Sequence, residues 1–267
     1  MKKVIIIIIF ISIAIGVYQY TFFSENKSID SFIVDKNITT TADIVPIDGN
    51  IVKPISYTSV ISLNSLDVPK KKESFIAMML PSILLTERRI KAERDRIEMI
   101  FSKVQRTPQD QIFIDTLKAS FNVEDETLLP KKLVTHPLSL VLAQAIIESG
   151  WGTSRFFLEA NNVFGIWSFN KEDNRISAGE TRGEKTIYLK KYETLQGSIY
   201  DYFKALSTVS YYKKFRVARR KSKDPLELVV HLSHYSELGI VYIQRVKAVI
   251  RQNDLQQYDN YQLESKP

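Results

Sequence analysis

One stretch of the sequence constrains the fold more than any other, an apolar run that starts after Pro137 and stops at two glycines. Its apolar residues recur at i, i+3, i+4, i+7 and i+8, the spacing of one buried helix face: Leu138, Val141, Leu142, Ala145 and Ile146. Pro137 suits the first turn of such a helix, with Thr135 or His136 as its cap. Gly150 and Gly152 can adopt the left-handed conformations that end a helix. The pattern therefore predicts a buried helix that ends at these glycines.

The single acidic residue of this stretch, Glu148, lies at the end of the predicted helix. It follows Val141 by seven residues and so projects from the edge of the buried face. Partial burial and the negative end of the helix dipole both disfavour the carboxylate and raise its pKa. A carboxyl group that stays protonated near neutral pH can act as a general acid. The alternative is an ordinary surface glutamate near a helix end.

Aromatic and amide side chains follow Glu148 within about twenty residues. The flat apolar faces are Trp151, Phe156, Phe164, Trp167 and Phe169, and the amides are Asn161 and Asn162. Aromatic rings can stack on sugar rings, and amides can bond acetamido and hydroxyl groups, so the group suits a sugar polymer. Each aromatic taken alone is more often part of a core.

These residues carry a family resemblance. The segments AQAIIESGWGTSRF and NNVFGIW, with YKKFR and YSELG further along, resemble the Bax-type branch of the glucosaminidases in glycoside hydrolase family 73. The resemblance covers about residues 70 to 260. It implies a mainly α (α+β), lysozyme-like fold, in which a cleft separates a helical lobe from a small β-hairpin lobe. It also implies cleavage of the β-1,4 bond after N-acetylglucosamine in peptidoglycan, with no cofactor.

The family pattern can be carried over residue by residue. The catalytic acid falls on Glu148, and the cleft tyrosine falls on Tyr212, with Tyr211 as an alternative. Substrate binding is expected of Tyr212 together with Trp151, Asn162, Phe164 and Trp167. Two rivals stay open at this point: a lytic transglycosylase on the same fold, and a non-catalytic protein that binds the cell wall.

A second carboxylate is less well defined. Family members often place one on the β-hairpin, which here is RISAGETRGEKTIYLKKY, so Glu180 and Glu184 are the candidates. Gly179 and Gly183 allow the tip to bend and favour Glu180. Inverting enzymes separate their carboxyls by about 6.5–9.5 Å and retaining ones by about 5–5.5 Å, whereas assistance by the substrate's acetamido group needs neither residue.

The N-terminus predicts export. Lys2 and Lys3 precede an apolar run of 14 residues from position 4 to 17, so residues 1–23 are a signal peptide or a membrane anchor. The lysines stay on the cytoplasmic side, which places the rest of the chain in the periplasm or cell envelope. Residues 24–70 are rich in polar residues and are expected to form a flexible tether. Residues 71–267 form the catalytic domain with a helical extension, its core at about 130–260.

The remaining elements are expected to be mostly helical. Helical spacing runs through residues 72–106, where Pro81 is expected to kink or restart the helix, and a short helix is expected at 109–121. The segment from NNVFGIWSF to EKTIYLKKY is typical of a strand, a long turn and a second strand. Helices return after Thr194.

Composition excludes several kinds of site. The chain has no cysteine, so it has no disulfide and no thiolate metal site. His231 and His234 lie at i,i+3, but no carboxylate completes a metal set with them, and no metal is expected. The net charge is +7, and residues 213–223 (KKFRVARRKSK) are strongly basic. For an exported chain this predicts attraction to an anionic wall or membrane leaflet rather than binding to nucleic acid.

Overall fold

A computed structural model describes residues 33–182 and 185–264. The described chain is mainly helical with small two-stranded sheets, as expected, and falls into two compact units. The larger unit comprises residues 34–90 and those from 134 onward, and the smaller one comprises residues 91–133 with residue 33. Every residue of the candidate site belongs to the larger unit.

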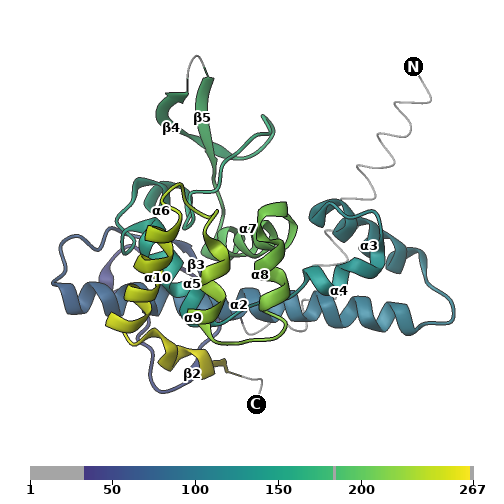
Figure 1. Cartoon of the computed structure of the whole chain (residues 1–267). Coiled ribbons are helices and arrows are strands. Elements are labelled where there is room, and N and C mark those ends of the chain that lie inside the picture. Colours follow the sequence, from purple (N-terminus) through teal and green to yellow (C-terminus); the bar gives the residue numbers. More distant parts are fainter. Residues whose placement is uncertain (1–32, 183–184, 265–267) are drawn as a thin grey trace. The chain divides into compact units, whose positions relative to one another are not determined.

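The elements of the larger unit are shown in Figure 1. Its helices are the first part of α2 (Val68–Ser102), α5 (Leu138–Ser149), α6 (Arg155–Ala160), α7 (Leu195–Thr208), α8 (Lys213–Ala218), α9 (Pro225–Leu228) and α10 (Ile240–Gln252). Short 3-10 turns are η1 (Thr41–Asp43), η3 (Ser210–Tyr212), η4 (Val229–Leu232) and η5 (Leu255–Asn260). The strands are β1 (Val34–Asn37), β2 (Ile51–Val52), β3 (Ile55–Ser59), β4 (Arg175–Arg182), β5 (Lys185–Lys190) and β6 (Gln262–Leu263).

Helix α2 continues through Pro81 and does not restart there, contrary to one of the two outcomes expected from the sequence. Proline inside a helix removes a backbone hydrogen bond and costs about 3 kcal/mol. The turns on both sides of Pro81 are almost wholly buried, with Phe75, Met78 and Ile83 at 0% exposure. Packing of these side chains offsets the lost bond.

Residues 33–70 are not the flexible tether that their composition suggested. Strand β1 pairs in parallel with β3, and β2 pairs in parallel with β6 near the C-terminus. Tyr57 and Leu63 have no exposed surface, and the Tyr57 hydroxyl accepts a hydrogen bond from the backbone N–H of Val45. Ser56 also donates to the side chain of Gln196 on α7. Burial of these side chains against the helices orders the segment, while residues 24–32 lie outside the described part.

Helix α5 is the centre of the larger unit. It is buried from Leu138 to Ile146 on every face, and α10 and η5 pack against it. Its first turn is capped by neither Thr135 nor His136, because the N-cap position is Pro137. Instead the carboxylate of Asp259 accepts hydrogen bonds from the backbone N–H and the hydroxyl of Ser139, at 2.8 and 2.9 Å. A carboxylate from another element therefore satisfies the positive end of this helix.

Strands β4 and β5 form an antiparallel hairpin that extends away from the helices of its unit (Figure 1). Ser177 pairs with Tyr188 and Thr181 pairs with Thr186, so three residues of β4 face one of β5. Gly179, in this irregular stretch, has a φ of +80°. The strand expected in NNVFGIWSF does not form, since only Trp167 there makes a β-bridge, to Leu189.

The smaller unit contains α3 (Pro108–Phe121), η2 (Glu126–Leu128), α4 (Leu129–Lys132) and the end of α2. Thr107 and Asp110 form a reciprocal capping box at the start of α3, and Lys103 pairs with Asp110 at 2.8 Å. Arg96 lies over the ring of Phe113, 4.1 Å from its centroid. These contacts fix the helix predicted at 109–121.

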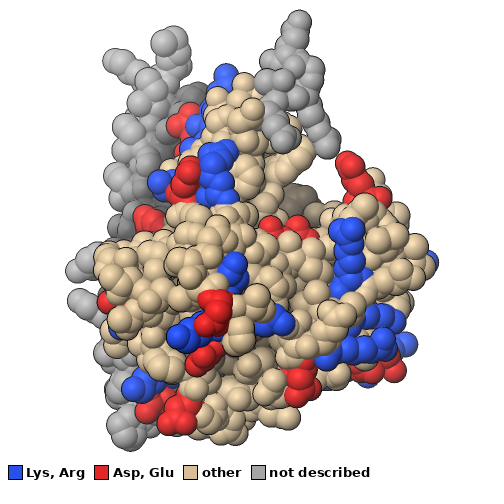
Figure 2. Space-filling view, turned by 90° about the vertical axis from the view of Figure 1, so that its left-hand side faces the viewer, with Lys and Arg blue, Asp and Glu red and all other residues tan. Residues whose placement is uncertain are grey.

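The described surface mixes charges of both signs. Figure 2 shows one face, on which lysines and arginines are interspersed with aspartates and glutamates. Exposed pairs such as Lys91 with Asp95 and Arg155 with Glu159 are spaced i,i+4 along helices. Within residues 33–182 and 185–264, no helix combines the length and apolarity needed to cross a bilayer. The apolar run at positions 4–17 lies outside these residues.

Candidate active site

The turn after α5 fixes the place of Glu148. Gly150, Trp151 and Gly152 all have positive φ angles, of 59°, 59° and 74°. The turn is also tightly packed, because a Cβ on Gly152 would lie 3.0 Å from the rings of both Phe157 and Phe75. The Ser149 hydroxyl accepts a hydrogen bond from the Gly152 N–H at 3.0 Å. The two predicted helix-ending glycines are confirmed, and Trp151 joins them in the left-handed region.

Glu148 is partly buried at the last turn of α5. Burial raises the pKa of its carboxyl group, and a hydrogen bond from the Tyr242 hydroxyl to Oε1, at 2.9 Å, partly opposes this rise in pKa. The net direction is upward, as the sequence suggested. The site thus holds a carboxyl group that favours its protonated form more than an exposed glutamate does.

The charge of this carboxyl group acts on four tyrosines, which we call the tyrosine cluster: Tyr202, Tyr212, Tyr235 and Tyr242. The rings of Tyr235 and Tyr242 are stacked, with centroids 5.4 Å apart. Tyr235 also lies 6.3 Å from the rings of both Tyr212 and Tyr202. Burial raises the pKa of all four phenols, and the negative charge of Glu148 raises it further. They therefore act at neutral pH as uncharged hydrogen-bond donors and apolar walls.

The structure distinguishes the two tyrosines that the sequence offered. Tyr212 belongs to the cluster, and the charge of Glu148 contributes to its raised pKa. Tyr211 is 69% exposed and packs against His234. Tyr212 is therefore the one that lies close to the acid.

Four residues of the site were missed by sequence reasoning: Gln144, Tyr202, Tyr235 and Tyr242. The side-chain amide of Gln144 donates a hydrogen bond to the Tyr242 hydroxyl at 2.9 Å. The Tyr242 hydroxyl in turn donates to Glu148. Gln144 precedes Glu148 by four residues, so the i,i+4 spacing places both on one helix face and could have revealed it. Tyr242 lies 94 residues beyond Glu148 and carries no comparable signal in the sequence.

Two of the predicted substrate-binding aromatics differ in their surroundings. Phe164 is buried and stacks on Tyr202 with a centroid distance of 4.2 Å, so it packs against the tyrosine cluster. Trp167 is 37% exposed and lies beside Phe169, which is 86% exposed. This pair offers apolar faces to solvent, and Trp167 fits the role of a sugar platform better than Phe164 does.

Trp151 packs on α2, where its ring meets Phe75 edge-on at 5.6 Å and the Lys72 ammonium lies over it at 5.4 Å. These contacts pack the ring of Trp151 against the turn and α2, and the sugar contact expected of this half-buried residue stays a prediction. A ring held by Phe75 stabilises the left-handed backbone at its own position.

Asn162 also has a structural role instead of the predicted ligand contact. Both amide hydrogens are used, because Nδ2 donates to the carbonyls of Ile166 and Lys190 at 2.9 and 2.8 Å. Its Oδ1 accepts the Ile166 N–H at 2.9 Å, and the residue is only 1% exposed. Asn161 likewise donates to backbone carbonyls, including that of Thr58. The two asparagines join the loop to neighbouring strands.

The hairpin carboxylates are only partly described. The backbone of Glu180 lies in β4, in the irregular stretch after Ser177, but its side chain is outside what the structure describes. Glu184 lies outside the described residues altogether. The second carboxylate therefore stays a prediction.

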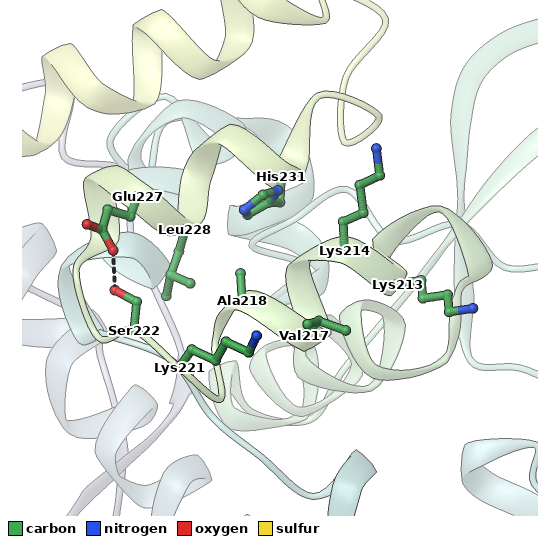
Figure 3. Close-up of a pocket in the computed structure, with 9 residues that line it drawn as sticks. All are labelled: Lys213, Lys214, Val217, Ala218, Lys221, Ser222, Glu227, Leu228 and His231. Atoms are coloured by element: carbon green, nitrogen blue, oxygen red, sulfur yellow. Dashed lines mark hydrogen bonds between the residues drawn. The ribbon is translucent and has the colours of Figure 1, made fainter.

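A cavity of about 680 Å³ lies between α8 and the α9–η4 segment and is separate from the acid (Figure 3). Its lining includes Lys213, Lys214, Lys221 and His231, and the Ser222 hydroxyl donates to Glu227 across one end at 2.6 Å. Neither Glu148 nor the tyrosine cluster lines it. In the described ranges no three His, Asp or Glu residues lie together as a metal site would need.

Comparison with known proteins identifies a family match that lies almost entirely within the larger unit. Residues 130–255 match the glucosaminidase family, described as mannosyl-glycoprotein endo-beta-N-acetylglucosaminidase. The exo-glucosaminidase LytG of Bacillus subtilis is 27% identical over 181 residues, which cover 60% of this chain and 57% of LytG. Protein bax of Escherichia coli is 24% identical over 198 residues, or 68% and 70% of the two chains.

Among solved structures, the catalytic domain of the autolysin Auto from Listeria monocytogenes aligns with 62% of this chain and 97% of its own. Its TM-score is 0.40 and its sequence identity is 24%. The match at residues 130–255 contains Glu148, Gln144 and all four residues of the tyrosine cluster. The resemblance noted in the sequence is thus confirmed: residues 130–255 belong to the glucosaminidase family of glycoside hydrolases, to which LytG and Bax are homologous.

Proposed function

We propose that the chain is a peptidoglycan hydrolase that cleaves the β-1,4 bond after N-acetylglucosamine, with Glu148 as the general acid. The observation that supports this assignment is a partly buried carboxyl group with a raised pKa, held by a hydrogen bond from Tyr242 of the tyrosine cluster. Sugar rings would lie in a lysozyme-like cleft between the helices and the β4–β5 hairpin, with Tyr212 and Trp167 as contacts. Membership of a glycoside hydrolase family gives the reaction class.

The chemistry follows from the protonation state of Glu148. Its proton moves to the glycosidic oxygen while the bond from that oxygen to C1 of N-acetylglucosamine breaks, and the leaving sugar departs as an alcohol. Positive charge then develops at C1 and the ring oxygen. Water adds to C1 and loses a proton to a carboxylate, either on the hairpin or Glu148 itself, depending on the stereochemical course. The product is a reducing N-acetylglucosamine end.

Muropeptide analysis tests this proposal directly. Purified peptidoglycan digested with the full chain should release fragments that end in reducing N-acetylglucosamine, detected by mass spectrometry before and after borohydride reduction. Anhydro ends would instead identify a lytic transglycosylase. Binding to peptidoglycan without any release of fragments would identify a wall-binding protein.

Replacing Tyr242 with phenylalanine should shift the pH dependence of catalysis. The Tyr242 hydroxyl donates to the carboxylate and favours the charged form of Glu148, so its loss should raise the pKa of Glu148 further. A general acid is active while it is protonated, and the alkaline limb of the kcat/KM profile should therefore move to higher pH. The measurement is the pH profile on solubilised peptidoglycan. Tyr211→Phe, at an exposed position, is the control and should leave this limb in place; an unshifted limb in Tyr242→Phe would contradict the assignment.

The hairpin provides a second test. Three residues of β4, including Glu180, face one residue of β5, and such a bulge can redirect a side chain. We therefore expect Glu180→Gln to lower kcat by a larger factor than Glu184→Gln, with KM little changed. Azide should partly restore activity to Glu180→Ala if that carboxylate activates water. Wild-type rates in both single variants and in the double variant would favour assistance by the substrate's acetamido group.

Export is proposed from residues 1–23, which lie outside the described residues. Lys2 and Lys3 before the apolar run place the following domain on the far side of the inner membrane. A phosphatase reporter that requires the periplasm, fused after Pro267, should be active. A reporter active only in the cytoplasm would overturn this expectation. Fractionation of the fusion would show whether residues 1–23 remain as an anchor or are removed.

A further inference from the structure

A continuous row of hydrogen bonds runs from Glu148 into the interior. The Tyr242 hydroxyl donates to Glu148 Oε1 at 2.9 Å and accepts from Gln144 Nε2 at 2.9 Å. Gln144 Oε1 accepts from the Tyr202 hydroxyl at 2.7 Å, and that hydroxyl oxygen lies 2.8 Å from Nε2 of His136. We call this row the buried relay. It connects α5 with α7 and α10, and the three bonds furthest from Glu148 are fully buried.

The groups of the relay can donate their hydrogen bonds in only one direction along the row at a time, because each tyrosine hydroxyl has a single proton. If Tyr202 donates to Gln144, then His136 must donate to Tyr202 from a protonated Nε2. In the opposite direction Nε2 would accept from Tyr202, the Gln144 amide would be turned over, and Tyr242 would donate to Gln144. Tyr242 would then have no proton for Glu148, and the acid would have to donate its own proton to Tyr242.

The surroundings of His136 favour the first direction. The ring is 2% exposed, among Tyr202, Phe203 and Phe215. Burial together with the positive charges of Arg219 and Lys223 lowers its pKa well below the usual value, so the ring is neutral and has one proton. Its Nδ1 has no hydrogen-bond partner within the described residues, and neither has Nη1 of Arg219.

An N–H at Nδ1 would therefore be a buried donor without an acceptor, in a ring on which the positive charge of Arg219 already acts. Such orphaned N–H groups are rarer and costlier than unpaired acceptors. A lone pair at Nδ1 is instead favoured by the nearby positive charge. The proton consequently belongs on Nε2, where Tyr202 accepts it.

We propose that His136 is a positioning residue, whose Nε2–H sets the direction of the buried relay so that Tyr242 donates to Oε1 of Glu148 and the acidic proton is held on Oε2. An oxygen that already accepts a hydrogen bond from Tyr242 is the poorer place for this proton. Oε2 receives no hydrogen bond within the described part of the chain and is free to serve the glycosidic oxygen. The catalytic consequence rests on the proposed function, whereas the proton on Nε2 does not.

Nitrogen NMR of the full chain labelled with ¹⁵N-histidine tests the tautomer without any activity measurement. The chain has three histidines, so the signals missing from His136→Gln assign this ring. We expect a neutral imidazole between pH 7 and 8, with a protonated Nε2 and a bare Nδ1. A protonated Nδ1 or an imidazolium in this range would overturn the proposal even if the chain cleaves peptidoglycan. If it does not cleave, the tautomer still decides the direction.

A matched pair of variants tests the consequence for catalysis. His136→Gln can keep an N–H donor near Tyr202, whereas His136→Leu cannot, and loss of one hydrogen bond corresponds to about a tenfold effect. We expect His136→Leu to lower kcat about tenfold with KM within about twofold, and His136→Gln to recover most of the loss. Phe203→Leu, which alters the same ring contact without a polar atom, should keep kcat. Equal losses in all three folded variants would reduce His136 to a packing residue.

Discussion

Replacing Glu148 with glutamine is expected to leave the fold intact and to abolish nearly all glycan cleavage. Glutamine has the same size and can still accept the hydrogen bond from Tyr242, but it has no acidic proton for the leaving oxygen. Positioned acid catalysis contributes on the order of 10²–10⁴-fold, so the loss in kcat should be at least about 100-fold. Reducing ends released from purified peptidoglycan measure it, with KM determined alongside.

The control for this substitution is Glu159→Gln. Glu159 is an exposed glutamate on α6 whose partner, Arg155, is one turn away at 3.2 Å. Exposed pairs of this kind contribute less than about 1 kcal/mol, and the control should keep both activity and stability. Circular dichroism and urea unfolding should show that both variants fold. Activity of Glu148→Gln within about threefold of the wild type would remove Glu148 from the proposed mechanism.

The central helix and its acid could be predicted because the information is local. The spacing of Leu138 and its successors defines the buried face, and Gly150 and Gly152 define the end. The upward direction of the Glu148 pKa follows from those two facts alone. In contrast, the partner of Glu148 comes from α10, and a single sequence offers no spacing that connects residues 94 positions apart.

The order of residues 33–70 was missed for the same physical reason. Strands β1, β2 and β3 are two to five residues long, too short for alternation to be read, and β2 pairs with β6 more than 200 residues away. What orders the segment is the burial of Tyr57 and Leu63. Polar composition describes the exposed side chains of such a segment and says little about the few that are buried.

The aromatic and amide residues after Glu148 show where residue type alone misleads. Phe164 and Asn162 have the chemistry of sugar contacts, yet their side chains are buried against the protein itself, at 6% and 1% exposure. Their neighbours Trp167 and Phe169 remain exposed. Burial decides whether such a residue packs within the protein or is available to a sugar. Burial in turn depends on tertiary contacts that a short motif does not contain.

Asn162→Ala gives the second large effect that we expect, a loss of stability rather than of affinity. The substitution removes three hydrogen bonds, to the Ile166 and Lys190 carbonyls and from the Ile166 N–H, at a site only 1% exposed. At about 1 kcal/mol each, and with backbone groups left unpaired, the free energy of unfolding should fall by about 3 kcal/mol. Urea unfolding followed by tryptophan fluorescence measures this loss.

Kinetics then separate a structural asparagine from one that binds the sugar. Both amide hydrogens of Asn162 are already used within the protein, so KM of the folded fraction should stay within about twofold of the wild type. Asn170→Ala is the matched control, because Asn170 is exposed and its side chain accepts one hydrogen bond, from the Glu172 N–H. Loss of that bond should cost about 1 kcal/mol or less. A stable Asn162→Ala variant with a KM raised tenfold would restore Asn162 to the substrate site and place the loop, not the tyrosine cluster, at the centre of sugar recognition.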